Sequence, residues 1–166
     1  MRVVSAACVL VASILPVVCA ATDGAHADSA KYNNAIAVRK ITDACNIYKL
    51  DVKSRTCMSA SSIARFKEAF ERMLKSNGYL ATATPKYYVD VDIREIRISW
   101  APIVGVEVVS NITYTVSGAG SGPKKYPVQA TGNANIVSMP IGLLRAPVAY
   151  AMSFGQNVKQ FIRQLR

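Results

Sequence analysis

The chain has 166 residues, a net charge of +10 and 51% hydrophobic residues. This length supports one domain with a hydrophobic core of its own. Only 18% of the residues are charged, which excludes a disordered basic tail and a coiled coil, because both need more charge and fewer apolar residues. A single folded globular domain remains.

Residues 1–27 have the features of a secretory signal. One basic residue, Arg2, precedes an apolar run from Val3 to Ala21, and Ala25-His26-Ala27 forms a small-x-small cleavage pattern. We expect cleavage after this pattern. The alternatives are cleavage after Ala20, a retained membrane anchor, and lipidation of Cys19, which a bulky valine directly before the cysteine disfavours.

Loss of residues 1–27 leaves the net charge unchanged, since the remaining 139 residues keep 19 Lys and Arg against 9 Asp and Glu. It removes the only histidine, His26, and leaves Cys45 and Cys57 as the cysteines of the mature chain. In an oxidising compartment these two are expected to form a structural disulfide, since a redox pair usually has C-x-x-C spacing. We therefore predict a periplasmic or outer-membrane-associated protein.

The mature chain is expected to start with a flexible lead-in at 28–34, followed by one domain at 35–166. Ala35–Ile41 carries β-branched residues at alternate positions, which predicts a first strand. Ser61 or Ser62 then caps a helix, and Asn77-Gly78 ends it with a left-handed C-cap. The apolar residues of this helix share one face: Ile63, Phe66, Phe70, Met73 and Leu74.

Three strands are predicted next. In Tyr87–Trp100 the apolar residues change parity, which requires a bulge near Arg94-Glu95. Val104–Val116 alternates between apolar and polar residues, so one face is buried and the other is solvated. After a Gly-rich turn, Tyr126–Ile136 repeats the pattern, and Pro127 places this strand at an edge of the sheet.

A helix from Ile141 to Leu165 closes the chain, with Pro147 in its first turn or at a kink. The order of elements predicts an α+β two-layer sandwich, in which a four-stranded, mainly antiparallel sheet carries two helices on one face (β-α-β-β-β-α). The expected inner stripe of the closing helix is Leu144, Val148, Ala151, Phe154, Val158, Phe161, Ile162 and Leu165.

The residue content argues against catalysis. Without histidine, the mature chain lacks the proton shuttle of Ser-His-Asp and Cys-His catalysis, and it has neither a zinc-ligand cluster nor a phosphate-binding glycine motif. We therefore predict no enzyme, no catalytic residue, no metal and no cofactor. Asp90 and Asp92 could form a glycosidase-like carboxylate pair, but Arg94 on the same face favours simple charge pairing. A small secreted carboxylate-based enzyme or effector is the alternative function.

Basic residues occur on every predicted element, without a stacking platform or recognition helix, so nucleic acid is not an expected partner. The densest pairs are Lys124-Lys125, beside the Gly-rich turn, and Arg39-Lys40. Both pairs are candidate contacts for an anionic partner, and plain solubility charges are the alternative interpretation. A net charge of +10 favours anionic lipid or lipopolysaccharide surfaces, with contacts that salt weakens.

Four segments give the chain a familiar layout: FKEAFERMLKSNGYL (66–80), KYYVDVDI (86–93), NITYTVSG (111–118) and NVKQFIRQL (157–165). Over residues 35–165 this layout resembles small envelope proteins of Gram-negative bacteria with a β-α-β-β-β-α fold, such as lipopolysaccharide-assembly lipoproteins and the auxiliary lipoproteins of ABC transporters. The resemblance implies a non-enzymatic accessory protein that binds an envelope protein or surface, within a transport or envelope-assembly complex. A plain structural subunit of such a complex is a further alternative.

Overall fold

The computed structural model describes residues 31–49, 52–54, 56–101, 105–118, 120–135, 137 and 141–166. The expected signal, its cleavage sites and Cys19 lie outside the described residues, as do Val104 and Ile136 at two expected strand ends. The described elements are β1 (Ile36–Asp43), β2 (Ile47–Lys49), β3 (Val52–Ser54), α2 (Ala60–Ser76), β4 (Tyr87–Ala101), β5 (Gly105–Gly118), β6 (Ser121–Asn135) and α3 (Gly142–Gln164).

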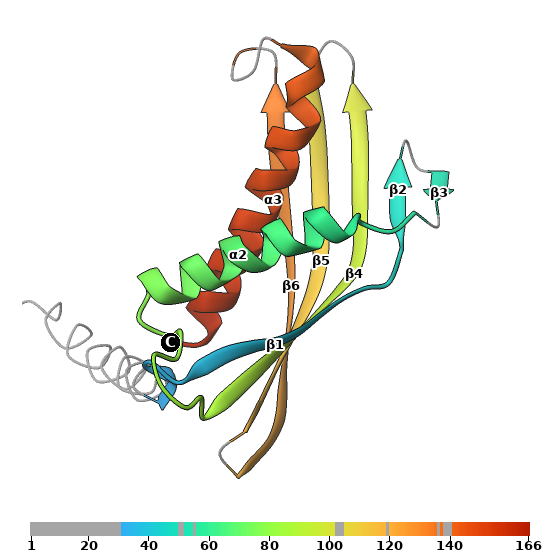
Figure 1. Cartoon of the computed structure of the whole chain (residues 1–166). Helices are drawn as coiled ribbons and strands as arrows, with labels where there is room; N and C mark the ends of the chain where they lie inside the picture. The colour runs from blue at the N-terminus through green and yellow to red at the C-terminus, as the bar shows by residue number, and fades with distance from the viewer. Residues whose placement is uncertain are drawn as a thin grey trace, which may run out of the picture.

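The strands form one mixed sheet in the order β3-β2-β4-β5-β6, with β1 also paired to β4. β4, β5 and β6 are an antiparallel meander. β1 runs parallel to the first half of β4 and β2 parallel to its second half, so these two strands follow one another along the same edge of β4. Both helices lie on the same face of the sheet (Figure 1), which confirms the α+β class and the helix placement.

The predicted four-stranded sheet needs correction, because the polar segment between the cysteines contains the β2–β3 hairpin. Each of these strands has 3 residues, too few for an alternating pattern to appear in the sequence. The predicted bulge in β4 is confirmed, since the register to β5 shifts between Ile93 and Glu95. The shift lets Ile93 and Ile96 both face the core.

α2 begins two or three residues earlier than the sequence predicts, because the predicted N-cap is Ser61 or Ser62. Ser59 is the N-cap, and its hydroxyl accepts a hydrogen bond from the Ser62 backbone N–H at 3.2 Å. The helix ends as expected at Asn77, and Gly78 follows with φ 75°, a conformation that favours glycine. The buried face consists of Phe66, Phe70 and Leu74.

α3 turns a different face to the sheet from the one its apolar pattern predicts. In its first half the buried positions are Arg145, Ala149, Ser153 and Asn157, whereas Leu144 is 46% exposed. The predicted stripe is therefore wrong for Leu144 and Ala151, which are exposed, whereas Val148 and Phe154 are partly buried against the core. It is confirmed in the second half, where the apolar members are buried: Val158, Phe161, Ile162 and Leu165.

Hydrogen bonds explain why polar residues of α3 face inward. The Asn157 amide nitrogen donates to the Ser110 carbonyl at 3.0 Å and to the Val128 carbonyl at 3.1 Å. Its Oδ1 accepts from the Tyr114 hydroxyl at 2.9 Å. The Ser153 hydroxyl lies 2.8 Å from the Ser110 hydroxyl, which is also buried. A polar ladder thus joins α3 to β5 and β6, and its buried groups are satisfied.

Close backbone packing accompanies the ladder. A Cβ atom at Gly132 of β6 would lie 2.2 Å from the Ala149 carbonyl oxygen of α3, so only glycine permits this approach. Further along the helix, the Phe161 ring stacks on Tyr114 with centroids 4.1 Å apart, and Phe70 of α2 lies 5.9 Å from Phe161. The core lies between the sheet and the two helices.

The predicted Cys45–Cys57 disulfide is present and joins residues 12 positions apart. It closes the segment that holds the β2–β3 hairpin. Asp43, at the end of β1, supports the same closure, because its carboxylate accepts hydrogen bonds from the backbone N–H of Cys45 at 2.9 Å and of Met58 at 2.6 Å. The segment is thereby fixed at both of its ends.

Replacing Asn157 with alanine is expected to lower the free energy of unfolding by about 3 kcal/mol, because the buried Tyr114 hydroxyl and two backbone carbonyls lose their partner. Urea denaturation measures the change. Gln164→Ala, which removes an exposed amide from the same helix, is the matched control and should change stability by less than about 0.5 kcal/mol. Equal effects of the two substitutions would contradict the role of the ladder.

Removing the disulfide with Cys45→Ser and Cys57→Ser together is expected to lower the free energy of unfolding by about 3 kcal/mol, since the unfolded chain gains the entropy of an open loop. The same loss should follow when the unsubstituted protein is denatured in the presence of a reductant. A double variant as stable as the parent protein would show that the closure contributes nothing.

Candidate functional site

β4 begins and the β5–β6 hairpin turns at the same end of the sheet (lower end of Figure 1). Lysines from three segments belong to this end. Lys86 directly precedes β4, whose first residue, Tyr87, pairs with Gly118. Lys124 and Lys125 lie on β6 close to the turn. The ammonium group of Lys31 lies 5.7 Å from the centroid of the Tyr87 ring. We call Lys31, Lys86, Lys124 and Lys125 the basic end.

Tyrosine rings support two of these lysines. Lys31 also lies 5.5 Å from the Tyr32 ring, and Lys124 lies 5.0 Å from the Tyr126 ring, distances that fit cation–π contacts. Tyr32 is buried and packs edge-on against Tyr87 with centroids 4.9 Å apart. This corrects the expected flexible lead-in at 28–34, because its described residues contribute Tyr32 to the core.

The phenol groups of this cluster lie in a mostly apolar setting. Burial, together with a nearby Tyr126 hydroxyl, raises the pKa of Tyr32 to about 12, although Lys31 and Lys124 act in the opposite direction. The Tyr126 hydroxyl itself is buried and has no partner in hydrogen-bond geometry among the described side chains. Tyr32 therefore stays neutral at physiological pH, and the charge of the basic end comes from its lysines.

Elsewhere in the described part of the chain, most acidic side chains are compensated locally. Asp43 accepts two backbone N–H groups at the disulfide, and other carboxylates have basic partners. Asp90, near the start of β4, is the acidic residue that shares a cross-strand row with Thr115 and Lys125, and it is paired with Arg39. The ion pairs are Arg39–Asp90, Arg94–Asp92 at 2.6 Å, Arg97–Glu95, Arg72–Glu68 at 3.6 Å and Lys67–Glu71 at 3.8 Å.

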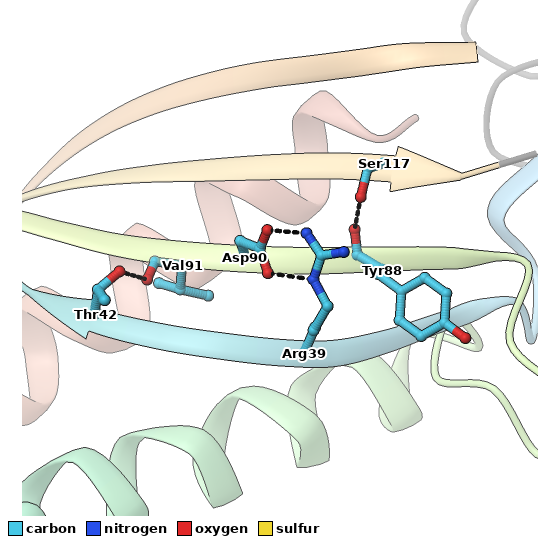
Figure 2. A network of polar contacts seen from close by, with 6 residues as sticks. All are labelled: Arg39, Thr42, Tyr88, Asp90, Val91 and Ser117. Carbon is cyan, nitrogen blue, oxygen red and sulfur yellow. Dashed lines mark hydrogen bonds and ion pairs between the residues drawn. The ribbon is translucent and has the colours of Figure 1, made fainter. Parts of the chain in front are cut away.

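Arg39 and Lys40, the second predicted basic pair, lie on β1. Figure 2 shows the Arg39 guanidinium facing the Asp90 carboxylate, with Nε donating to Oδ1 at 2.8 Å and Nη2 donating to Oδ2. These bonds lower the pKa of Asp90. Lys40 pairs in register with Asp90, and Lys125 pairs with Thr115, the β5 neighbour of Asp90. The two basic pairs therefore lie on one row of the sheet, separated by β4 and β5.

The carboxylates that could suggest hydrolytic chemistry are both held in ion pairs, Asp90 by Arg39 and Asp92 by Arg94. This is the charge pairing that the sequence favoured, with Arg39 as an additional partner. Within the described residues, no cluster of three or more His, Cys, Asp or Glu side chains could hold a metal ion. No described helix is long and apolar enough to span a membrane.

An apolar groove of about 560 Å³ opens between the two helices at the other end of the molecule. Its volume is in the range of small-molecule sites. Arg65 and Ser62 are its polar members, so hydrocarbon would fit it better than a polar ligand. The lining residues are Ile47, Met58, Ser62, Arg65, Phe66, Ala69, Pro147, Tyr150, Ala151 and Phe154.

The sequence indicated half of the basic end. It singled out Lys124-Lys125 because they are adjacent, and it missed Lys31 and Lys86, which are far away along the chain. A local signal did exist, because the dipeptide Lys-Tyr occurs at 31–32, 86–87 and 125–126. In each case the tyrosine is buried at the end of the sheet, which leaves the lysine beside it at the surface.

Comparison of the sequence with protein-family models finds no match, and neither does comparison with curated protein sequences. Similar solved structures include a DUF330 protein of Xanthomonas campestris, with 12% identity over 81% of this chain and 84% of the other and a TM-score of 0.47. Rare lipoprotein B of Shewanella oneidensis has 7% identity over 76% and 90%, with a TM-score of 0.42.

A minor lipoprotein of Acinetobacter baumannii is also similar, with 9% identity over 78% of this chain and 92% of the other and a TM-score of 0.41. Two of these three proteins are named as lipoproteins, the class that the sequence layout resembles. With TM-scores below 0.5 and identities of 12% or less, the similarity assigns neither a family nor an activity to this chain.

The raised pKa of Tyr32 predicts a specific loss of stability at high pH. A phenol whose pKa is higher in the folded state than in the unfolded state stabilises the fold at low pH. That contribution is lost as pH rises from about 10 towards 12. Tyr32→Phe should therefore reduce the fall in the free energy of unfolding between pH 9 and pH 11, measured by urea denaturation. If the free energy of unfolding falls equally with pH in the two proteins, the raised pKa of Tyr32 is contradicted.

Proposed function

We propose that the exported chain is a non-enzymatic binding protein of the bacterial envelope that docks through its basic end onto phosphate groups of lipid headgroups or lipopolysaccharide. The observation that carries the proposal is the gathering of Lys31, Lys86, Lys124 and Lys125 at one end of the sheet, where the acidic residue in the row of Lys125, Asp90, is already paired with Arg39. The disulfide supports residence in an oxidising compartment.

The charge of the basic end is large enough for such binding. A lysine near an anionic membrane surface contributes about 1 kcal/mol, so the basic end would contribute about 4 kcal/mol, or roughly a thousandfold in affinity. The attraction acts over about 8 Å at physiological ionic strength. Binding would therefore depend on direct contact of this end with the surface and would weaken as salt is added.

The proposed role is binding without catalysis, and the residues of the chain are consistent with it. The mature chain has no histidine, and both carboxylates considered for catalysis are bound to arginines. A binding role needs only an exposed, charged and well-supported surface. The tyrosine rings under Lys31 and Lys124 supply that support.

Vesicle co-sedimentation tests the proposal with the exported protein and the double variant Lys124→Gln, Lys125→Gln. The parent protein should bind vesicles that contain phosphatidylglycerol and not vesicles of phosphatidylcholine alone, and the variant should bind about 30-fold more weakly. A separate arm with purified lipopolysaccharide distinguishes the two sources of phosphate. Binding in either arm should decrease with added salt.

The matched control is the double variant Lys49→Gln, Lys67→Gln, which removes the same charge from β2 and α2. It should bind nearly as well as the parent protein, since neither residue lies at the basic end. Equal losses in the two double variants would mean that net charge alone drives binding. Absence of binding in both the lipid and the lipopolysaccharide arms would refute the proposal.

A further inference from the structure

The free edge of the sheet at β6 carries backbone groups that no described strand pairs. β6 is the last strand of the sheet and pairs with β5 alone. Pro127 lies opposite Thr113 and has no N–H, so this pair is one of those without mutual hydrogen bonds. By alternation along the unbroken register, the N–H and C=O groups of Gln129, Thr131 and Asn133 point away from β5.

The two halves of the β6 edge differ in how well they are protected against pairing with a strand of another chain. Near the turn, β6 has Pro123, Lys124, Lys125 and Pro127, and proline and lysine are the residues by which natural edge strands avoid pairing with other chains. From Val128 to Asn135 the strand contains neither proline nor a charged residue. The stretch with outward-pointing donors and acceptors, from Gln129 to Asn133, is therefore open to another strand.

An apolar stripe on α3 flanks the open half of the edge. Leu144, Val148 and Met152 follow one another at four-residue spacing. Leu144 and Met152 are 46% and 44% exposed, and Val148 between them is partly buried against the core. The groove takes the opposite flank of the helix, with Pro147 and Phe154. Met152 lies directly over β6, because a Cβ atom at Gly132 would approach its Cβ to 2.9 Å. We call Leu144, Val148 and Met152 the outer stripe.

We propose that the open edge and the outer stripe form a two-fold interface with a second copy of this chain, in which β6 pairs antiparallel with β6 of the partner. Residues whose backbone N–H and C=O groups point away from β5 would pair with the same kind of residue in the partner. Thr131 would then lie opposite the partner's Thr131, and Gln129 opposite the partner's Asn133. The outer stripes of the two α3 helices would then meet above the joined sheet. Such an interface is isologous, since the same surface serves both copies.

The charge distribution is compatible with this dimer, although each copy carries +10. Lys125 is six residues from Thr131, which is about 20 Å along a strand. If the two β6 strands run antiparallel, Lys124-Lys125 of one copy and Lys124-Lys125 of the other would lie on opposite sides of the two-fold axis, about 40 Å apart. This distance is far beyond the screening length of about 8 Å. A parallel pairing would instead bring both basic pairs together.

Analytical ultracentrifugation of the exported full-length product tests the interface. The parent protein should sediment as a dimer that dissociates on dilution. Thr131→Pro should give a monomer, because the proline removes an outward donor and leaves the β5–β6 ladder intact, as Pro127 does. Met152→Lys, which places like charges across the axis, should weaken dimerisation at least tenfold. Circular dichroism and thermal unfolding check that both variants are folded.

The matched control is Ala64→Lys, which adds the same charge to an exposed position on α2 and should leave the dimer unchanged. If the parent protein is monomeric at every concentration, the edge does not pair with a second copy and the proposal fails. A dimer that persists in both Thr131→Pro and Met152→Lys would also overturn it. Vesicle binding by the basic end is measured separately, so either proposal can fail alone.

Discussion

The structure depends above all on the hydrogen bonds of one buried amide, Asn157. Its nitrogen donates to carbonyls of both β5 and β6, and its oxygen accepts from Tyr114. A buried amide that loses these partners costs far more than an exposed one, so α3 has one favourable rotation over the seam between the two strands. Gly132 adds a steric condition, since the helix approaches the strand too closely for any Cβ.

The rotation of α3 about its axis decides which of its other side chains are exposed to solvent. With Ser153 and Asn157 against the sheet, Leu144 and Met152 are left exposed on one flank, and Pro147 and Phe154 line the groove on the other. If apolar burial alone had set the rotation, Leu144 would face the core, and Val148, which is only partly buried, would be fully buried. The polar ladder therefore accounts for two exposed apolar features that hydrophobic packing would have removed.

Charged side chains also fall into two groups: those with an oppositely charged neighbour and those without one. Most described acidic side chains have an arginine or lysine beside them, as in Arg39–Asp90 on the open face of the sheet. Within the described part of the chain, the lysines of the basic end form no ion pair, and Lys31 and Lys124 lie beside tyrosine rings instead. A net charge that is spread through the sequence thus becomes a localised surface, which is the feature on which the proposed binding role rests.

The sequence by itself determined the features that depend on neighbouring residues. These are the four longer strands, the edge proline of β6, the bulge in β4, the end of α2 at Asn77-Gly78, and the pairing of Cys45 with Cys57. Only the tertiary structure decided the parallel pairing of β1 and β2 with β4, the rotation of α3, and the meeting of Lys31 and Lys86 with Lys124. The physical reason is that periodicity and capping act within a few residues, whereas buried hydrogen bonds and charge clusters join residues far apart in the chain. A polar residue such as Asn157 satisfies its burial through distant partners, so no local hydrophobic pattern could reveal it.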